Sequence, residues 1–329
     1  MQNYITGELL QCIIRLNRYC VRFEMLNLNS NSLRFSGHET FPIRQLWLSK
    51  VFHFVTSCIA NQETISFNGE QTMIKLGVGK NMVASMRFWA EAVGFITNKD
   101  GIRPTDLGQL VLGMLDPNSE HPSTAWLVHW NLASQPSSST VFWFLFNQIN
   151  SPIISRDEFQ TGLRIFADRA KKKVSDLTIK RDVEVCLRSY VPFLAGRNKV
   201  VTEEFVEPLL ASLGIVKVVS KDVIEIPRNS RPTLNNALFA YAIMDFWQSR
   251  LGNTSSLDFF QISHAIGSPG KVFRIDENSL SKRLEQLEEL TNGEIIWTEQ
   301  SGIKAVVRQK MALNDPNIFK KRMLQLAFK

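Results

Sequence analysis

The stretch GEQTMIKLGVGKNMVASMRFWAEAV, residues 69–93, decides the fold that the sequence predicts. Apolar residues recur at helical spacing over 69–76 and again over 80–93, where they form one stripe along the helix. Between the two segments, Gly77-Val78-Gly79 supplies a turn, because glycine interrupts a helix and accepts backbone conformations that other residues avoid. The stretch therefore predicts two helices joined by a glycine turn.

The residues on either side extend this pattern to a winged helix-turn-helix domain. Upstream, apolar positions from Pro42 to Ile59 predict another helix, with Pro42 in its first turn. Downstream, two β-rich runs flank Asn98-Lys99-Asp100-Gly101, a loop with the glycine of a tight hairpin, and Thr105 is placed to cap a last helix. This order of elements predicts a winged helix-turn-helix over 34–118.

The middle of the chain, residues 119–200, predicts a helical domain with a basic surface. Residues 122–150 are so rich in Trp and Phe that they predict a buried helical hairpin. Five tryptophans that lie in apolar helical patterns are expected in the core: Trp89, Trp126, Trp130, Trp143 and Trp247. Helical periodicity continues over 156–173 and 178–190. Before these regions, residues 1–33 predict a weakly ordered leader.

Residues 201–329 predict a C-terminal domain with a β-hairpin and a second winged-helix module. The hairpin surrounds Ser220-Lys221-Asp222. The module consists of helices expected at 234–250, 257–266 and 277–290, the last capped by Asp276, and of a hairpin at 294–307. The predicted fold class is therefore mainly α with small β-wings, with two winged helix-turn-helix modules flanking a helical middle domain.

Basic residues exceed acidic ones, 38 against 31, which gives a formal net charge of +7. Most of this excess lies in residues 155–200, which carry 11 basic and 6 acidic side chains. Such a surface suits a polyanionic partner, because Lys and Arg replace the counterions of a phosphate backbone. A solvated helix face of mixed charge is the alternative that the composition leaves open.

The predicted DNA contacts are polar or basic positions off the apolar stripe, in the hairpin and in the basic run of the middle domain. They are Lys80, Asn81, Ser85 and Arg87 in the helix, Lys99 and Arg103 in the hairpin, and Lys171, Lys172, Lys173, Lys180 and Arg181 in the middle domain. The helix residues are expected to approach the major groove, and the others to contact phosphates. Docking of the winged domains onto a partner protein is the competing interpretation.

The sequence contains no motif for catalysis, a cofactor or a metal ion, so we predict a protein that is not an enzyme. The five histidines stand far apart, without the spacing of a helical zinc site. The cluster Ser36-Gly37-His38-Glu39-Thr40 precedes the first predicted helix. We expect Thr40 to cap that helix and His38 with Glu39 to tie down the leader, and a catalytic pair of His38 and Glu39 is the alternative.

Cysteine usage and hydropathy predict a soluble cytoplasmic protein. The four cysteines lack a C-x-x-C pair, which argues against a zinc ribbon or a disulfide framework and fits a reducing compartment. No apolar run reaches the length of about 18 residues that a membrane span needs, and the N-terminus lacks the pattern of a signal peptide. We therefore expect no membrane partner.

Several strings resemble one bacterial family, domain of unknown function 4007. They are FSGHETFP (35–42), QLWL (45–48), LGVGKNMV (76–83), AWLVHW (125–130), RDV (181–183) and FAYA (239–242). Members occur near genes for DNA sulfur modification (phosphorothioation), including sulfur-transfer enzymes, and near phage-defence genes. The resemblance implies an accessory role in DNA modification or restriction and no established enzymatic activity.

Pattern and resemblance together predict a non-catalytic DNA-binding accessory protein of a bacterial phosphorothioation or anti-phage restriction system. Its expected partners are double-stranded DNA and sulfur-transfer or restriction proteins of the same gene cluster. The alternative is a protein adaptor that assembles a sulfur-transfer or nuclease complex without binding DNA itself. A homodimer stays open as well.

Overall fold

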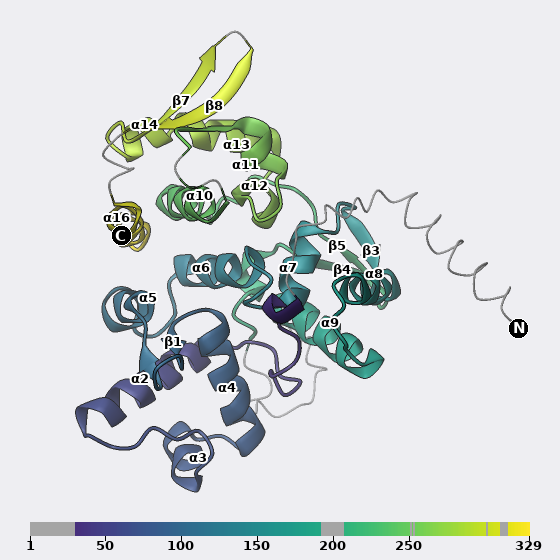
Figure 1. The fold of residues 1–329 in the computed structure, drawn as a ribbon, viewed down its shortest axis with the longest axis vertical. Helices are drawn as coiled ribbons and strands as arrows, with labels where there is room; N and C mark the ends of the chain where they lie inside the picture. Colours follow the sequence, from purple (N-terminus) through teal and green to yellow (C-terminus); the bar gives the residue numbers. More distant parts are fainter. Residues whose placement is uncertain (1–29, 192–206, 251, 253, 301, 310–314) are drawn as a thin grey trace, which may run out of the picture.

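The computed structural model describes residues 30–191, 207–250, 252, 254–300, 302–309 and 315–329. Helices dominate these residues and the strands form small antiparallel sheets, which confirms the predicted mainly-α class. In Figure 1 the N-terminal elements lie at one end, the middle of the chain at the centre and the C-terminal elements at the other end. None of the described helices has the length and apolar character of a membrane span. Most of the predicted leader, residues 1–29, lies outside the described residues.

The N-terminal elements follow the predicted order. They are α2 (Gln45–Ala60), α3 (Glu70–Leu76), α4 (Lys80–Ala92), β1 (Ile96–Thr97), β2 (Arg103–Pro104), α5 (Asp106–Leu110) and a π-helical turn over Val111–Leu115. Gly77 ends α3 with a φ of 70°, the left-handed conformation that explains a glycine at this turn. The Thr105 hydroxyl accepts a hydrogen bond from the Gly108 amide and caps α5, as predicted.

The predicted start of α2 is wrong. The residue preceding the helix is Arg44, so Pro42 lies before the first turn and Thr40 does not cap the helix. Residues 36–41 instead form a separate loop that is held by contacts from elsewhere in the chain.

The middle of the chain forms two helical pairs and a small sheet. The elements are α6 (Pro122–Ala133), α7 (Thr140–Asn147), β3 (Ile153–Ser155), α8 (Arg156–Arg169), α9 (Asp176–Tyr190), β4 (Lys217–Ser220) and β5 (Val223–Glu225). The predicted β4–β5 hairpin is present, and β3 pairs with β5 through the register Ile154 to Ile224. Strand β3 is not predicted by the sequence, and this sheet joins residues on both sides of the predicted boundary at residue 200.

The C-terminal elements include the second three-stranded sheet, with its strands in the order β6-β8-β7. They are α10 (Asn236–Arg250), β6 (Ser256–Asp258), α11 (Phe259–His264), α12 (Pro269–Val272), α13 (Glu277–Glu285), α14 (Leu287–Leu290), β7 (Ile295–Gln300), β8 (Ile303–Arg308) and α16 (Pro316–Ala327). Asp276 caps α13 as predicted, but the single helix expected over 277–290 divides at Gln286. The segment expected as a helix from residue 257 begins as strand β6, because it pairs with β8.

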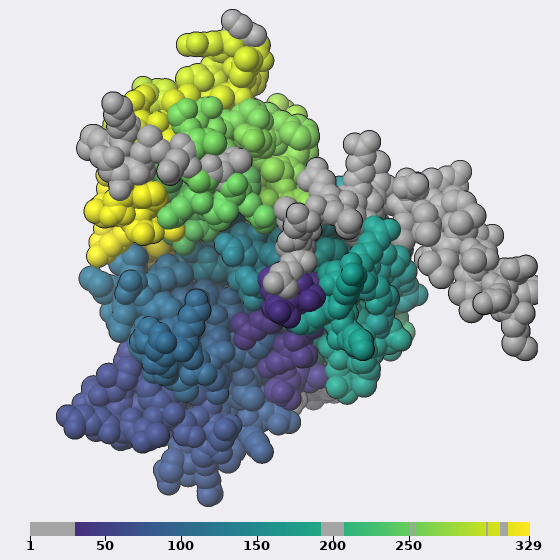
Figure 2. All heavy atoms as spheres, viewed as in Figure 1, coloured from purple at the N-terminus to yellow at the C-terminus, as the bar shows by residue number. Residues whose placement is uncertain are grey.

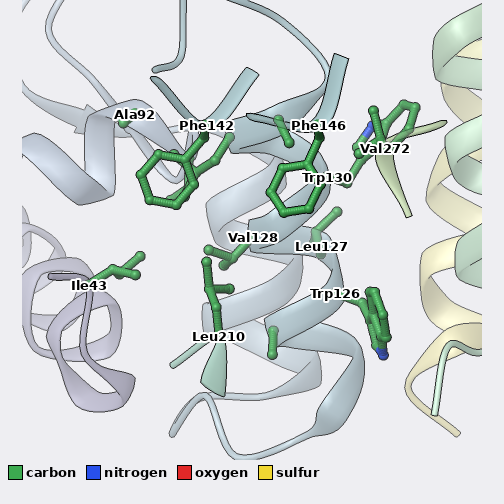
Figure 3. Packing of buried hydrophobic residues seen from close by; sticks show 14 of the residues in the cluster. Ile43, Ala92, Trp126, Leu127, Val128, Trp130, Phe142, Phe146, Leu210 and Val272 are labelled. Atoms are coloured by element: carbon green, nitrogen blue, oxygen red, sulfur yellow. The ribbon is translucent and has the colours of Figure 1, made fainter. Parts of the chain in front are cut away.

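One continuous hydrophobic core passes through the centre of the molecule. Figure 3 shows Trp126 and Trp130 at different heights along α6 and Phe142 and Phe146 of α7, with Ile43 approaching from the N-terminal side and Val272 from the C-terminal side. The tryptophans assigned to the core are fully buried, as predicted: Trp89, Trp126, Trp130, Trp143 and Trp247. Burial of this much aromatic surface is the main stabilising contribution to the fold.

His129 of α6 lies inside this core with both ring nitrogens in hydrogen bonds. Nδ1 lies 2.7 Å from the Tyr190 hydroxyl and Nε2 lies 2.9 Å from the Val272 carbonyl oxygen. Burial lowers the pKa of His129 from 6.5 to about 3, because the charged imidazolium would lose its hydration. The residue is therefore neutral in the folded protein near pH 7.

This burial makes the fold sensitive to acid. An unfolded histidine gains a proton below about pH 6.5 whereas the folded His129 does not, so the free energy of unfolding falls as the pH drops. We expect His129 to account for about 2 kcal/mol of lost stability between pH 7 and pH 5. Urea denaturation at both pH values, on the wild type and on His129→Gln, measures this contribution. An equal pH dependence of the two proteins would contradict it.

Buried arginines join the middle of the chain to its C-terminal part. Arg274 donates hydrogen bonds to the carbonyl oxygens of Ile149, Ser151 and Ile226. Arg231 donates to the Phe273 carbonyl oxygen, and Arg283 to the carbonyl oxygens of Ser230, Arg231 and Leu234. Burial lowers the pKa of Arg231 and of Arg274 to about 10. Part of the basic excess of this chain therefore serves the fold and does not face a partner.

Candidate nucleic-acid interface

The first turn of α4 presents two of the predicted DNA contacts. Lys80 and Asn81 are exposed there, directly after the glycine turn that follows α3. The prediction for Ser85 is wrong, because its side chain is fully buried and cannot reach DNA. Arg87 is half-buried: its Nε donates to Glu91 Oε1 at 2.8 Å, and its guanidinium lies over the Phe67 ring. The exposed polar surface of α4 is thus concentrated at its N-terminal end.

The β1–β2 hairpin carries two of the predicted basic residues, Lys99 in the turn and Arg103 at the start of β2. Lys99 is exposed, and Arg103 is exposed with its guanidinium 3.4 Å from the Asp100 carboxylate. An ion pair this exposed contributes little stability in water. A phosphate group can therefore replace the carboxylate at small cost.

The basic run of the middle domain divides between a turn and a helix. Lys171, Lys172 and Lys173 lie in the turn between α8 and α9, where Lys172 is half-buried and the other two are exposed. Lys180 and Arg181 lie on the exposed face of α9. The structure brings these last two residues into one hollow, and none of the other predicted contacts lines it.

This hollow, named here the α8–α9 hollow, has a volume of about 550 Å³. Its walls come from α8, from α9, from the turn between β4 and β5, and from Thr40. The lining residues are Thr40, Arg156, Asp157, Gln160, Leu177, Lys180, Arg181, Glu184, Val185, Arg188, Lys221 and Asp222. Arg156 and Arg188 belong to the basic segment 155–200 but are not among the predicted contacts, and neither is Lys221. These three residues come from separate elements that only the folded chain brings together.

The loop of residues 36–41, called the His38 loop below, packs against α4 and α9. Asp182 accepts hydrogen bonds from His38 Nε2 at 2.9 Å and from the Ser36 amide at 3.0 Å. The Thr40 amide donates to His38 Nδ1 at 3.2 Å, so the ring hydrogen lies on Nε2. In Figure 2 the segment that contains this loop (purple) lies between the N-terminal helices (blue) and α9 (teal). His38 therefore ties the loop to α9 through Asp182. The sequence does not predict this carboxylate as the partner of His38.

The backbone of the His38 loop is unusual. Ser36, Glu39 and Thr40 have positive φ angles of 58°, 46° and 65°, which residues other than glycine rarely adopt. At Gly37 φ is 93°, and an added Cβ would lie 2.5 Å from the Phe88 ring. A strained backbone of this kind persists only when surrounding contacts hold it in place. Here the buried Asp182 carboxylate holds the loop, because it accepts the hydrogen bonds from Ser36 and His38. Arg188 of α9 also donates to the Thr40 carbonyl oxygen at 3.3 Å.

Two further hollows lie outside this region. One of about 500 Å³ lies beside α2 and α3, with Lys50, His53 and Lys75 in its lining. The other, of about 620 Å³, lies among α5, α10 and α16, where Met114 and Ile318 expose 71% and 64% of their surface. Across the described ranges, no three His, Cys, Asp or Glu side chains gather as ligands for a metal ion.

The chain is similar in fold to solved structures, and its sequence matches the model of one protein family. A crystal structure of SspB with bound magnesium ion matches at a TM-score of 0.75 and 24% identity, over 91% of this chain and 89% of that chain. Another SspB crystal structure matches at a TM-score of 0.74 and 23% identity, over 89% of this chain and 87% of that chain. Likeness at these identities shows a shared fold. No curated protein matches the chain. The model of a family described as "Protein of unknown function (DUF4007)" matches residues 35–325.

Proposed function

The chain belongs to this DUF4007 family of proteins of unknown function, and from that premise we propose that it is a non-catalytic DNA-binding accessory protein of a bacterial DNA-modification or anti-phage system. The observation that carries the proposal is the exposed start of α4, where Lys80 and Asn81 follow a glycine turn after α3. The resemblance to a family found near DNA phosphorothioation genes supports the same function and indicates phosphorothioation as the modification.

The proposal interprets α2 to β2 as a winged helix-turn-helix. In that interpretation α4 is the recognition helix, because such domains insert the N-terminal residues of their second helix into the major groove. Lys99 and Arg103 of the β1–β2 hairpin then contact the flanking phosphates, which orient the protein but carry no sequence information. The C-terminal elements α10 to β8 support a second winged module, since helices there also precede a long hairpin.

Fluorescence anisotropy on a labelled duplex across a salt series tests this function. We expect Lys80→Glu combined with Lys99→Glu to weaken binding at least about tenfold near 100 mM salt. The slope of the logarithm of the affinity against the logarithm of the salt concentration (the salt slope) is expected to fall by about one, for the lost phosphate contact of Lys99. The matched control is Lys321→Glu, an exposed lysine of α16. Equal losses in the control and the test variant would remove α4 and the wing from the interface.

Two further arms define the function more closely. A phosphorothioate duplex, measured beside a plain duplex, shows whether the modified backbone is preferred. Supercoiled plasmid incubated with the protein and Mg²⁺ is expected to remain intact, and strand breaks would replace the non-catalytic proposal with a nuclease. Absence of duplex binding at low salt would refute the DNA-binding function.

A protein adaptor is the second candidate function, and the hollow among α5, α10 and α16 favours it. Apolar side chains line that hollow, including the exposed Met114 and Ile318, and exposed apolar surface of this kind is typical of docking sites. Copurification of a sulfur-transfer or restriction protein that is lost in Met114→Asp, without any change in DNA affinity, would support the adaptor.

A further inference from the structure

We propose that the α8–α9 hollow binds phosphate groups of the DNA backbone, in addition to the contacts made by α4 and the wing. This inference rests on the proposed DNA-binding function and assigns Arg156, Arg188 and Lys221 to the interface for the first time. Its basis is the charge, the spacing and the rigidity of the side chains that line the hollow.

The hollow carries an excess of positive charge. Five cationic side chains line it, against three carboxylates: Arg156, Lys180, Arg181, Arg188 and Lys221 against Asp157, Glu184 and Asp222. Glu184 is already paired with Arg156 at 2.5 Å. Within the part of the chain that the structure describes, Lys180, Arg181 and Lys221 have no ion pair. A phosphate entering the hollow therefore meets three cations that form no ion pair with the described residues.

The cations of the hollow come from successive turns of α9 and from a neighbouring turn of the chain. Lys180 and Arg188 lie two helical turns apart on α9, about 12 Å along the helix, so they can contact separate phosphates of one strand. Glu184, which lies between them, is paired with Arg156. Lys221 adds a cation from the turn between β4 and β5. The lining includes few apolar side chains, Leu177 and Val185, which suits a phosphate strand better than an apolar ligand.

Two arginines of the hollow are held in place before any ligand binds. Arg156 donates through Nε to the Lys221 carbonyl oxygen at 2.9 Å, which joins the start of α8 to the β4–β5 turn. Arg188 donates to the Thr40 carbonyl oxygen of the His38 loop, which Asp182 anchors. Side chains ordered in advance lose less entropy on binding, so each phosphate contact retains more of its free energy.

The salt dependence of duplex binding tests the hollow in the full chain. We expect Lys180→Ala with Lys221→Ala to lower the salt slope by about two and to weaken binding about tenfold near 100 mM salt. Both side chains are exposed, so the fold is expected to persist by circular dichroism. The matched control is Lys217→Ala with Lys321→Ala, two exposed lysines that do not line the hollow.

The possible outcomes distinguish a failure of phosphate binding in the α8–α9 hollow from a failure of the proposed DNA-binding function. Loss of affinity in Lys80→Glu with Lys99→Glu, but an unchanged slope in Lys180→Ala with Lys221→Ala, would overturn the hollow and leave the proposed function intact. A wild type that binds no duplex would overturn both. Inorganic phosphate at constant ionic strength is expected not to displace the duplex, because one phosphate group engages few of the cations. Displacement at millimolar phosphate would show a small-anion site and would contradict a backbone site.

Discussion

Replacement of Arg274 by alanine is expected to lower the free energy of unfolding by about 3–5 kcal/mol. The Arg274 guanidinium is buried and donates to the carbonyl oxygens of Ile149, Ser151 and Ile226. These acceptors belong to the segment after α7 and to the segment after β5, so one side chain satisfies backbone groups from two distant parts of the chain. Alanine would leave them buried without a donor, and each unsatisfied group costs about 1–3 kcal/mol.

Urea denaturation of the wild type and the variant measures this loss. Arg103→Ala is the matched control, because it removes an exposed arginine whose ion pair with Asp100 contributes little, and its effect is expected to stay below about 1 kcal/mol. Arg274→Lys is expected to lose most of the stability as well, since an ammonium group cannot reproduce the planar fork of donors. Equal stability of Arg274→Ala and Arg103→Ala would show that the buried hydrogen bonds are replaced, for example by water.

The local elements of this fold could be predicted, because their signals lie within a few residues of each other. The turn at Gly77, the Thr105 cap and the Asp276 cap each depend on one side chain and its own helix end. Strand β3 could not be predicted in the same way. It consists of three residues, and its partner β5 lies about 70 residues further along the chain, so no local periodicity marks it.

The candidate site was predictable only in part, for a related reason. Ser85 lies off the predicted apolar stripe of α4, yet it is fully buried, and Phe88 one turn further along is also buried where Gly37 of the His38 loop packs against it. Arginine is usually an exposed residue, but Arg274 and Arg283 are buried and donate hydrogen bonds to backbone carbonyl oxygens, so they stabilise the fold. In both cases, segments that are distant in the sequence bury the side chain, so the local sequence pattern does not predict its role.

The His38 loop provides the second large expected effect. Asp182→Ala is expected to lower the free energy of unfolding by about 2–4 kcal/mol, because it leaves two donors, His38 Nε2 and the Ser36 amide, without their acceptor. Asp182→Asn is expected to lose less, since its amide oxygen can still accept one of the two hydrogen bonds. Glu184→Ala is the matched control, because this carboxylate lies on the exposed side of the same helix.

The loop also connects this loss to the α8–α9 hollow. Its positive φ angles are held by the Asp182 anchor, so removal of the anchor releases the loop, and with it the Thr40 carbonyl oxygen that orients Arg188. Limited proteolysis is therefore expected to cut Asp182→Ala within residues 36–41 at conditions where the wild type resists, and duplex affinity is expected to fall although Asp182 contacts no DNA. If Asp182→Ala is destabilised but keeps its loop intact and its duplex affinity unchanged, the loss of stability does not affect the α8–α9 hollow. In that case Arg188 would bind without the help of the His38 loop.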